Sequence, residues 1–495
     1  MLTEKTNVII IMTDQQKANA INLYGNPICK TPALEKLAEE GIICEKAFTP
    51  HPLCVPARVS FWTSSYPHQH GSRRNETLIN PQAVHPFSIW KKAGYRTALL
   101  GKNHCFRQND RKRFFDVWCE MNHTTIFPDT SGMEWEIPVQ RVQQVFNEHQ
   151  KIELNYSHIS PVITDKDPDY HPTGALGIQA NAFLEAHQDN PFCLWLSFPH
   201  PHEPYIVPRK YYDMFPIDQI EIPPLPDPEK SAMPEHTKLL TEMLRSAEIA
   251  PDDLKRTIAA YYGNIRFIDD VIGNLLAKLE ELNLKENTLV VFCSDHGDFM
   301  GEWGMTVKGG VFHDSLTKIP LILSGPGIPA GIRETSFTSL IDIIPTILKL
   351  QGLPTPSTMI GNLLPSIYSG QERTAIFSEY GAGMDPMPAE VLKTLQTQGI
   401  GNFYESILAT LQWREAEGRR KMVRTDSWKY VYDPLGDTDE LYNLINDPHE
   451  LYNLAPNHHY REVVNDMKST LLDWSIKSED PVPVPHPIVK YQDNS

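Results

Sequence analysis

The sequence lacks a hydrophobic run long enough to cross a membrane. Its longest apolar stretch near the N-terminus, Val8–Met12, falls far short of the about 20 residues that a spanning helix requires. Charged residues precede this stretch closely, and no small-residue cleavage site follows it. We therefore expect the stretch to be a β-strand rather than a signal peptide, and we expect no membrane partner.

Cysteine is scarce, with seven residues scattered through a chain of 495. An odd number without a secretion signal favours reduced thiols over a disulfide framework. The sequence therefore predicts a cytoplasmic protein.

Basic residues are outnumbered, because 45 Lys and Arg stand against 62 Asp and Glu, which gives a formal net charge of −17. Nucleic-acid binders usually carry a basic stripe, so we expect no nucleic-acid partner. An anionic substrate stays possible, since the local field of a site decides that question. With 41% hydrophobic and 9% aromatic residues, the chain can fill a sizeable core.

Short, continuously apolar segments alternate with amphipathic segments along residues 1–370. Such apolar segments suit strands that are buried on both faces of a parallel sheet. The expected strands are Asn7–Thr13, Arg96–Gly101, Phe192–Phe198, Thr288–Ser294 and Ile319–Ser324. The clearest expected helices are a segment that starts at Thr31-Pro32 and ends at Gly41, and the segment Tyr262–Leu282. This alternation predicts a doubly wound, mostly parallel α/β domain over residues 1–370.

Other segments depart from the alternation. His123–Pro172 and the proline-rich Pro216–Pro251 are expected to run over the surface as long excursions. Met422–Tyr432 carries Trp428, Tyr430 and Tyr432 in alternation ahead of the turn residues Pro434 and Gly436, which is typical of an antiparallel hairpin. We therefore expect a smaller α+β domain with an antiparallel sheet over residues 371–495.

Titratable residues follow several of the expected strands. In open α/β sheets, ligands bind at the carboxyl ends of the strands. These ends carry Asp14, then Lys102 and His104, then His202, then Asp295 and His296. Each residue alone is better explained as a cap or a surface group, but their common location favours a site.

Two carboxylates and an imidazole in this set could bind one divalent cation. Asp14, Asp295 and His296 with a further oxygen suit calcium or manganese, and the imidazole leaves zinc open. Gln15 is an additional candidate ligand, whereas Asp298 is better explained as a turn residue beside Gly297.

The most specific motif is Cys54-Val55-Pro56-Ala57-Arg58, of the form C-x-P-x-R. The residues that follow resemble the start of a helix, and a helix N-terminus favours an anion. The alternative is a buried structural cysteine ahead of the helix.

Taken together, these stretches resemble the sulfatase family of the alkaline phosphatase superfamily. The resemblance covers most of the chain, and the order and spacing of its stretches are more specific than any one of them. The matching stretches are Asn7–Asp14, Cys54–Arg58, Ala93–Arg96, Gly101–His104, Pro201–Tyr205, Ser294–Asp298, Lys308, Phe312–Leu321, Arg424–Tyr430 and Asp439–Leu444.

The resemblance implies an alkaline phosphatase-like fold and a sulfuric ester hydrolase. It implies that a maturation enzyme oxidises Cys54 to Cα-formylglycine, whose hydrate attacks sulfur and later expels sulfate. It further implies a cation, Ca²⁺ first with Mn²⁺ or Zn²⁺ as alternatives, bound by Asp14, Asp295, His296 and residue 54. The expected substrate is a small-molecule or saccharide sulfate ester.

Roles for the basic residues follow from the same resemblance. Arg58 would hold the formylglycine, Lys102 would bind a sulfate oxygen, and His104 would be the base that releases sulfate. His202 and Lys308 would contact sulfate and the leaving oxygen, with one of them as general acid. Asn75 would bind substrate, although a capping role is equally compatible with its position.

Two departures from the family pattern leave alternatives open. Many sulfatases carry adjacent acidic residues where this chain has Thr13-Asp14, and Asp-Asn where it has Asp295-His296. The reduced set also resembles phosphonate monoester and phosphodiester hydrolases, although Lys102 and His104 favour a sulfatase. A third hypothesis is a cation-binding protein without catalysis, in which Cys54 is never converted.

Overall fold

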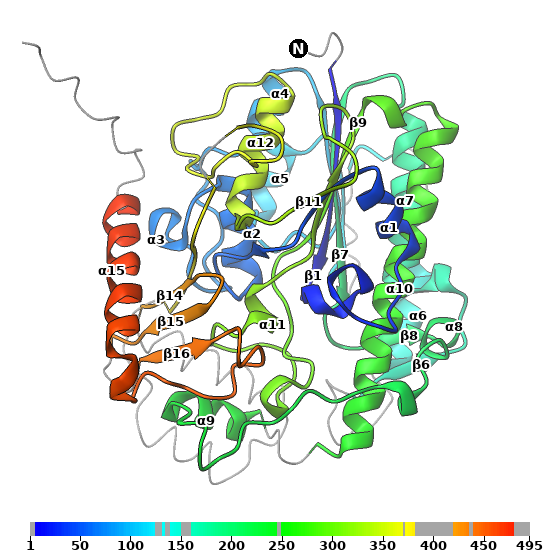
Figure 1. The fold of residues 1–495 in the computed structure, drawn as a ribbon. Helices are drawn as coiled ribbons and strands as arrows, with labels where there is room; N and C mark the ends of the chain where they lie inside the picture. The colour runs from blue at the N-terminus through cyan, green and yellow to red at the C-terminus, as the bar shows by residue number, and fades with distance from the viewer. Residues whose placement is uncertain are drawn as a thin grey trace, which may run out of the picture.

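The computed structural model describes residues 5–123, 131–133, 139–149, 160–244, 249–369, 372–381, 419–434 and 439–479. Its centre is an eight-stranded sheet with helices on both faces (Figure 1). In spatial order the strands are β11 (Ile332–Glu334), β2 (Gly41–Cys44), β10 (Leu321–Ser324), β9 (Thr288–Ser294), β1 (Asn7–Asp14), β7 (Phe192–Pro201), β4 (Arg96–Gly101) and β5 (Val117–Glu120). Strand β10 is antiparallel to both of its neighbours, and the other neighbouring pairs are parallel. The predicted doubly wound, mostly parallel sheet is confirmed.

The strands form where the sequence is continuously apolar, because both faces of the sheet are covered. One face packs against α1 (Pro32–Glu39), α7 (Pro172–His187) and α10 (Pro251–Glu281). The other packs against α2 (Cys54–Thr63), α4 (Pro86–Lys92) and α12 (Ile343–Leu350). Burying apolar residues on both faces removes the period-2 alternation of a half-exposed strand.

Several boundaries differ from the prediction; the strand predicted over Phe192–Phe198, for example, extends to Pro201. The last predicted strand starts at Leu321 rather than Ile319, and the long predicted helix starts at Pro251 rather than Tyr262. Pro251 lies in the first turn of α10 and is followed there by Asp252 and Asp253, which are favourable residues at a helix N-terminus.

Both predicted surface excursions contain regular structure among their described residues. The first contains α6 (Val139–His149) and β6 (Val162–Thr164), which pairs with β8 (Ile206–Pro208). The second contains α9 (Glu235–Met243), so the prediction of a plain loop was wrong there. Helix α9 forms because Leu240 and the following Leu244 are four residues apart and both are buried in one apolar cluster.

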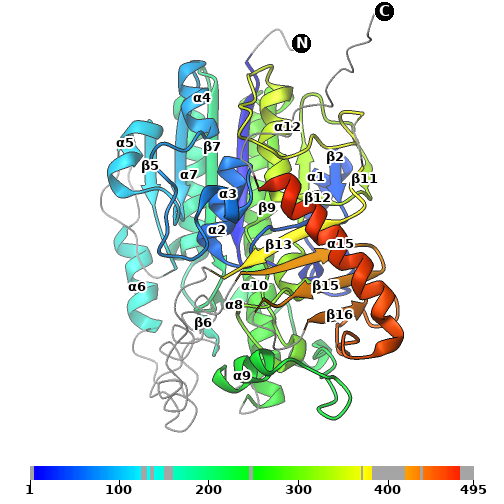
Figure 2. The same cartoon turned by 90° about the vertical axis from the view of Figure 1, so that its left-hand side faces the viewer.

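A second, antiparallel sheet confirms the predicted C-terminal α+β region. Its strands in order are β13 (Ile376–Tyr380), β14 (Arg420–Arg424), β15 (Trp428–Tyr432) and β16 (Glu440–Asn443). Figure 2 shows α15 (Arg461–Ser478) lying across this sheet. The proposed domain boundary at residues 370 and 371 falls outside the described residues and stays a prediction.

The remaining described elements are short or peripheral. They are β3 (Ala47–Phe48), β12 (Thr338–Ser339), α3 (Pro67–His70), α5 (Arg111–Phe114), α8 (Arg209–Tyr212) and α11 (Asp314–Thr317). All seven cysteines are buried and unpaired, as predicted. Within the described ranges, no helix combines the length and the apolar content needed to cross a membrane.

Candidate active site

The register of the central sheet brings the predicted site residues to one level. Asp14 pairs with Pro201 in β7, Thr13 pairs with Ser294 in β9, and Gly101 pairs with Ser197. The segments that carry Lys102, His202 and Asp295 therefore leave the sheet together, at the carboxyl ends of their strands.

Cys54 is the first residue of α2 and is fully buried at this rim. The next backbone N–H, that of Val55, donates to Asn75 Oδ1 over 3.1 Å. Asn75 therefore caps α2 from a segment about 20 residues further along the chain. A capping role was the alternative to substrate binding that the sequence left open for this residue. Burial raises the pKa of the Cys54 thiol to about 11, so the unmodified side chain is an uncharged, weak nucleophile at neutral pH.

Four side chains form a buried cluster that suits a divalent cation. Donor atoms of Asp14, Cys54, Asp295 and His296 all lie within 4.8 Å of one another. Cys54 Sγ lies 3.1 Å from His296 Nε2 and 3.6 Å from Asp14 Oδ1. His296 Nδ1 donates to the Gly297 carbonyl over 2.8 Å, which leaves the Nε2 lone pair facing the cluster. Burial lowers the pKa of His296 to about 3, so the imidazole is neutral and able to bind a metal.

Arg58, on helix α2, contacts residues in or next to several strands at the rim. It is fully buried, and its Nε donates to Asp295 Oδ2 over 2.8 Å. Its Nη1 donates to the Lys102 carbonyl at 3.0 Å and to Ser197 Oγ at 2.9 Å. The guanidinium thus offsets the charge of Asp295 and contacts residues in or directly after β4, β7 and β9.

Lys102 and His104 follow β4 on this rim. Lys102 Nζ pairs with Asp14 Oδ2, and burial lowers the pKa of this lysine to about 7. His104 has a left-handed backbone (φ 57°), and its Nδ1 has no hydrogen-bond partner among the described residues. Burial, followed by the positive charges of Lys102 and Arg58, holds the pKa of His104 well below its usual value. A neutral imidazole of this kind can accept a proton.

His202 and Lys308 form a hydrogen-bonded pair. His202 Nδ1 lies 2.6 Å from the Glu203 carbonyl, which can only accept, so Nδ1 carries the proton. Lys308 Nζ lies 2.7 Å from His202 Nε2 and therefore donates to it. Burial lowers the pKa of Lys308, but Cys54 in its ionised form and the negative charges of Glu203 and Asp295 together outweigh burial and raise it. Lys308 is thus the member of the pair that holds a transferable proton.

Gln15 belongs to the support of Lys308 rather than to the cation cluster. Its Oε1 accepts from Lys308 Nζ, while its Nε2 donates to Asp298 Oδ2 at 2.6 Å and to Glu203 Oε2 at 2.8 Å. Asp298 Oδ1 accepts from the Met300 N–H at 2.8 Å, as expected of a turn-forming carboxylate. Because the amide oxygen and the amide nitrogen of Gln15 both have hydrogen-bond partners, its oxygen is directed at Lys308 rather than at a metal cation in this structure.

The sequence interpretation missed His123 and Glu203. His123 Nε2 lies 3.1 Å from Lys102 Nζ and 3.2 Å from Asp14 Oδ2, and its ring stacks on His202 with centroids 3.7 Å apart. The available signal was position, since His123 comes three residues after β5, another strand that ends at this rim. Glu203 lay inside a matching stretch without an assigned role.

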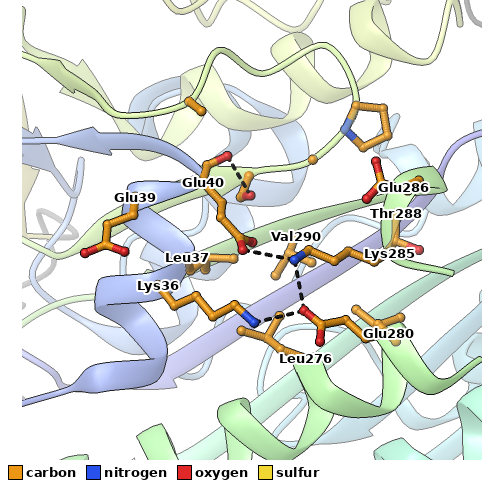
Figure 3. A pocket seen from close by; sticks show the side chains of 15 residues that line it. Lys36, Leu37, Glu39, Glu40, Leu276, Glu280, Lys285, Glu286, Thr288 and Val290 are labelled. Atoms are coloured by element: carbon orange, nitrogen blue, oxygen red, sulfur yellow. Dashed lines mark hydrogen bonds and ion pairs between the residues drawn. The ribbon is translucent and has the colours of Figure 1, made fainter. Parts of the chain in front are cut away.

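A hollow of about 410 Å³ lies at the opposite end of the sheet (Figure 3). Thr288, the first residue of β9, lines it, whereas Asp295 follows the other end of that strand. Its charges pair with one another, since Glu280 contacts Lys36 and Lys285, and Lys285 also contacts Glu40. This hollow therefore takes no part in the cluster.

Known proteins resemble the chain over nearly its whole length. Choline-sulfatase of Rhizobium meliloti (strain 1021) is 29% identical over 460 residues, covering 90% of this chain and 81% of that protein. The solved structure of a phosphonate monoester hydrolase from Silicibacter pomeroyi superposes with a TM-score of 0.77 at 21% identity, covering 96% of each chain. Another solved structure, a complex with its substrate D-glucosamine-2-N,6-O-disulfate, gives a TM-score of 0.71 at 19% identity and covers 97% of this chain and 99% of that one.

These superpositions establish the alkaline phosphatase-like fold that the motifs predicted. The sequence model of the family described as Sulfatase matches residues 6–353, which contain every residue of the site described above. The chain therefore belongs to the sulfatase family of the alkaline phosphatase superfamily.

Proposed function

We propose that the protein is a sulfuric ester hydrolase that cleaves a sulfate monoester with a formylglycine made from Cys54. The observation that carries this proposal is the buried cluster at the sheet rim. It places the cysteine of the C-x-P-x-R motif against two carboxylates and a neutral imidazole, beside Lys102 and Lys308.

Conversion of Cys54 by a maturation enzyme gives the residue a function that its thiol lacks. The thiol is uncharged at neutral pH, and a sulfated thiol has no easy route of release. A hydrated aldehyde at this position supplies one hydroxyl to attack sulfur and a second whose deprotonation expels sulfate.

The donor set fits a hard or borderline divalent cation held by Asp14, Asp295, His296 and residue 54. We propose Ca²⁺, with Mn²⁺ or Zn²⁺ as alternatives. A cation there would lower the pKa of a bound hydroxyl and withdraw charge from the sulfate group.

Adding the cation to chelator-treated protein should raise its thermal unfolding temperature. At a hundredfold excess over Kd, binding contributes about 2.7 kcal/mol, or about 3–6 °C for a chain of this size. Differential scanning fluorimetry with Ca²⁺, Mn²⁺ and Zn²⁺ in parallel ranks the ions. The Asp295→Asn variant should lose the shift, whereas Asp116→Asn, a variant of a carboxylate whose side chain pairs with Lys91 instead, should keep it. An equal shift in both variants would count against this cluster.

The basic residues have distinct proposed roles. Arg58 holds Asp295 and offsets negative charge, Lys102 binds a sulfate oxygen, and His104 accepts the proton whose loss releases sulfate. We propose that Lys308 is the general acid for the leaving oxygen. His202 cannot donate from Nε2, because that atom accepts the Lys308 proton.

Asn75 is proposed to bind substrate with its amide nitrogen while its oxygen caps α2. The Asn75→Asp variant keeps a capping oxygen but loses the donor and adds negative charge beside an anion. We expect KM for an aryl sulfate to rise about 10-fold or more with little change in thermal stability, since one lost hydrogen bond to a charged group costs about 1.5–3 kcal/mol. An unchanged KM in steady-state kinetics would leave Asn75 with the capping role alone.

The substrate class is proposed from the relatives as a small-molecule or saccharide sulfate ester. The alternative ester is a phosphonate monoester or phosphodiester, for which the similarity to a phosphonate monoester hydrolase provides the specific support. 4-Nitrophenyl sulfate and a 4-nitrophenyl phosphonate have the same leaving group. Their rates of hydrolysis therefore compare reaction at sulfur directly with reaction at phosphorus. A higher kcat/KM on the sulfate supports our proposal, and a higher value on the phosphonate supports the alternative.

Peptide mass spectrometry on protein from its native source tests the nucleophile directly. The peptide that contains Cys54 should be lighter by about 18 Da, since formylglycine replaces the thiol-bearing carbon by an aldehyde. The peptide that contains buried Cys105 serves as the control and should keep its thiol mass. A plain thiol at Cys54, with no turnover of either ester, would instead favour a cation-binding protein without catalysis.

A further inference from the structure

Lys308 lies on a loop, residues 295–313, that connects β9 to α11. At the site its Nζ contacts Gln15 Oε1 and His202 Nε2. Within the loop, the Phe299 N–H donates to the Val307 carbonyl at 2.9 Å, and the Gly301 N–H donates to the Met305 carbonyl at 2.8 Å. No helix or strand of the central sheet contains Lys308, so its position depends on what the back of this loop packs against.

The back of the loop is apolar and packs on two other segments. Phe299, Trp303, Met305 and Val307 are buried in one cluster with Leu240 and Leu244 from the α9 region and Tyr442 from β16. Apolar packing excludes water, but it fixes orientation less precisely than directed hydrogen bonds do.

Directed contacts come from the C-terminal region. Trp303 Nε1 donates to the carbonyls of His449 and Glu450, each over 3.1 Å. Lys429 Nζ donates to the Phe312 carbonyl over 2.8 Å, and the Asp314 N–H donates to Glu450 Oε1 over 2.7 Å. Both the middle and the end of the loop are therefore bound to residues that lie more than a hundred positions further along the chain.

Buried charges stand at the centre of these contacts. Lys429 is 0% exposed and Glu450 is 1% exposed. The Lys429 ammonium lies 2.8 and 2.7 Å from the two Glu450 oxygens and 2.6 Å from Asp314 Oδ1. A buried ion pair often adds little net stability compared with apolar residues of the same shape, whereas its geometry is specific. Lys429 and Asp314 also lie in two of the stretches that match the sulfatase family, and the proposed chemistry uses neither residue.

We propose that Lys429 and Glu450 are positioning residues, through which the C-terminal sheet holds the Lys308 loop in its catalytic geometry. The inference rests on the proposed function, in which Lys308 protonates the leaving oxygen. In this proposal the C-terminal region contributes to catalysis by positioning Lys308, without direct contact with substrate.

The test is leaving-group dependence in the Lys429→Met/Glu450→Gln double variant. This variant removes both charges together, keeps an oxygen for the Asp314 N–H, and leaves Asp314 paired with Arg424. A 4-nitrophenolate leaving group needs little protonation, whereas an alkyl alcohol needs a positioned acid. We expect kcat to fall about 10- to 100-fold more on an alkyl sulfate than on 4-nitrophenyl sulfate, as for a misplaced catalytic group.

A matched control comes from the same sheet. Arg420 and Asp433 form another buried ion pair, with Nη2 and Oδ2 2.9 Å apart, and neither makes a contact with the Lys308 loop among the interactions described. The Arg420→Met/Asp433→Asn variant should lose comparable stability but change both esters equally. If the Lys429→Met/Glu450→Gln protein fails to fold, Trp303→Phe keeps an aromatic ring at this position, removes the donor to His449 and Glu450, and should show the same selective loss to a smaller extent.

The outcomes distinguish a failure of the proposed function from a failure of the positioning role of Lys429 and Glu450. A wild-type protein that turns over neither ester would overturn the proposed function and this inference with it. A wild-type protein that turns over both esters, with equal proportional losses in the loop-contact variants, would overturn the inference alone.

Discussion

Cys54→Ala should lose essentially all ester hydrolysis, by at least about 10⁴-fold in kcat, because removing a covalent nucleophile leaves only binding and electrostatic contributions. Cys54 is the cysteine at the centre of the donor cluster, with its Sγ 3.1 Å from His296 Nε2. Steady-state kinetics on 4-nitrophenyl sulfate, with the wild-type protein verified as converted at residue 54, measures the loss.

Cys193→Ala is the matched control for this experiment. Cys193 is an equally buried, unpaired cysteine in the same sheet, but it lies near the amino end of β7, away from the rim. Its replacement should lower stability slightly through a small cavity and leave kcat close to that of wild type. If Cys54→Ala retained activity comparable to this control, the nucleophile assignment would be wrong.

Lys308→Met should lose activity in a leaving-group-dependent way. A general acid contributes about 10²–10⁴-fold when the leaving group is a poor one, so the loss should reach this range on an alkyl sulfate. On 4-nitrophenyl sulfate the loss should be about 10-fold or less, because the departing phenolate is stable without a proton. The ratio of the two losses, measured at saturating substrate, reports acid catalysis separately from binding.

Two further variants sharpen this prediction. Lys308→Arg keeps the positive charge but holds its proton too tightly to act as an acid, so KM should be retained while kcat on the alkyl ester stays low. Lys278→Met replaces a partly buried lysine of α10 that pairs with Glu185 and Glu281 away from the rim, and should change neither ester selectively. Equal losses on both esters for Lys308→Met would transfer the acid role to another residue.

The elements that carry the site could be predicted from the sequence because they follow local rules. β1, β4, β7 and β9 each contain a continuous apolar run, since helices cover both faces of the sheet, and such runs are visible without any tertiary information. Parallel strands end at one rim, so Asp14 and Asp295 could be placed together from their positions alone.

Residues whose roles depend on distant partners could not be assigned in this way. Gln15 was a candidate cation ligand, and only the folded chain shows its amide engaged by Lys308, Asp298 and Glu203. A role for His123 could not be predicted from the sequence, because this residue follows the edge strand β5 and contacts Asp14 only in the folded structure.

The sequence by itself therefore determined the fold class, the family, and most of the residues at the rim, because apolar periodicity and motif spacing can be read along the chain. Only the tertiary structure decided which of Lys308 and His202 holds the transferable proton, since that depends on the Glu203 carbonyl beside the His202 ring. It alone also linked Lys429 and Glu450 to the Lys308 loop. The contacts of Lys308 with His202, of Lys429 with Phe312 and of Glu450 with Asp314 join segments more than a hundred residues apart, and their geometry is set by packing and burial rather than by local sequence.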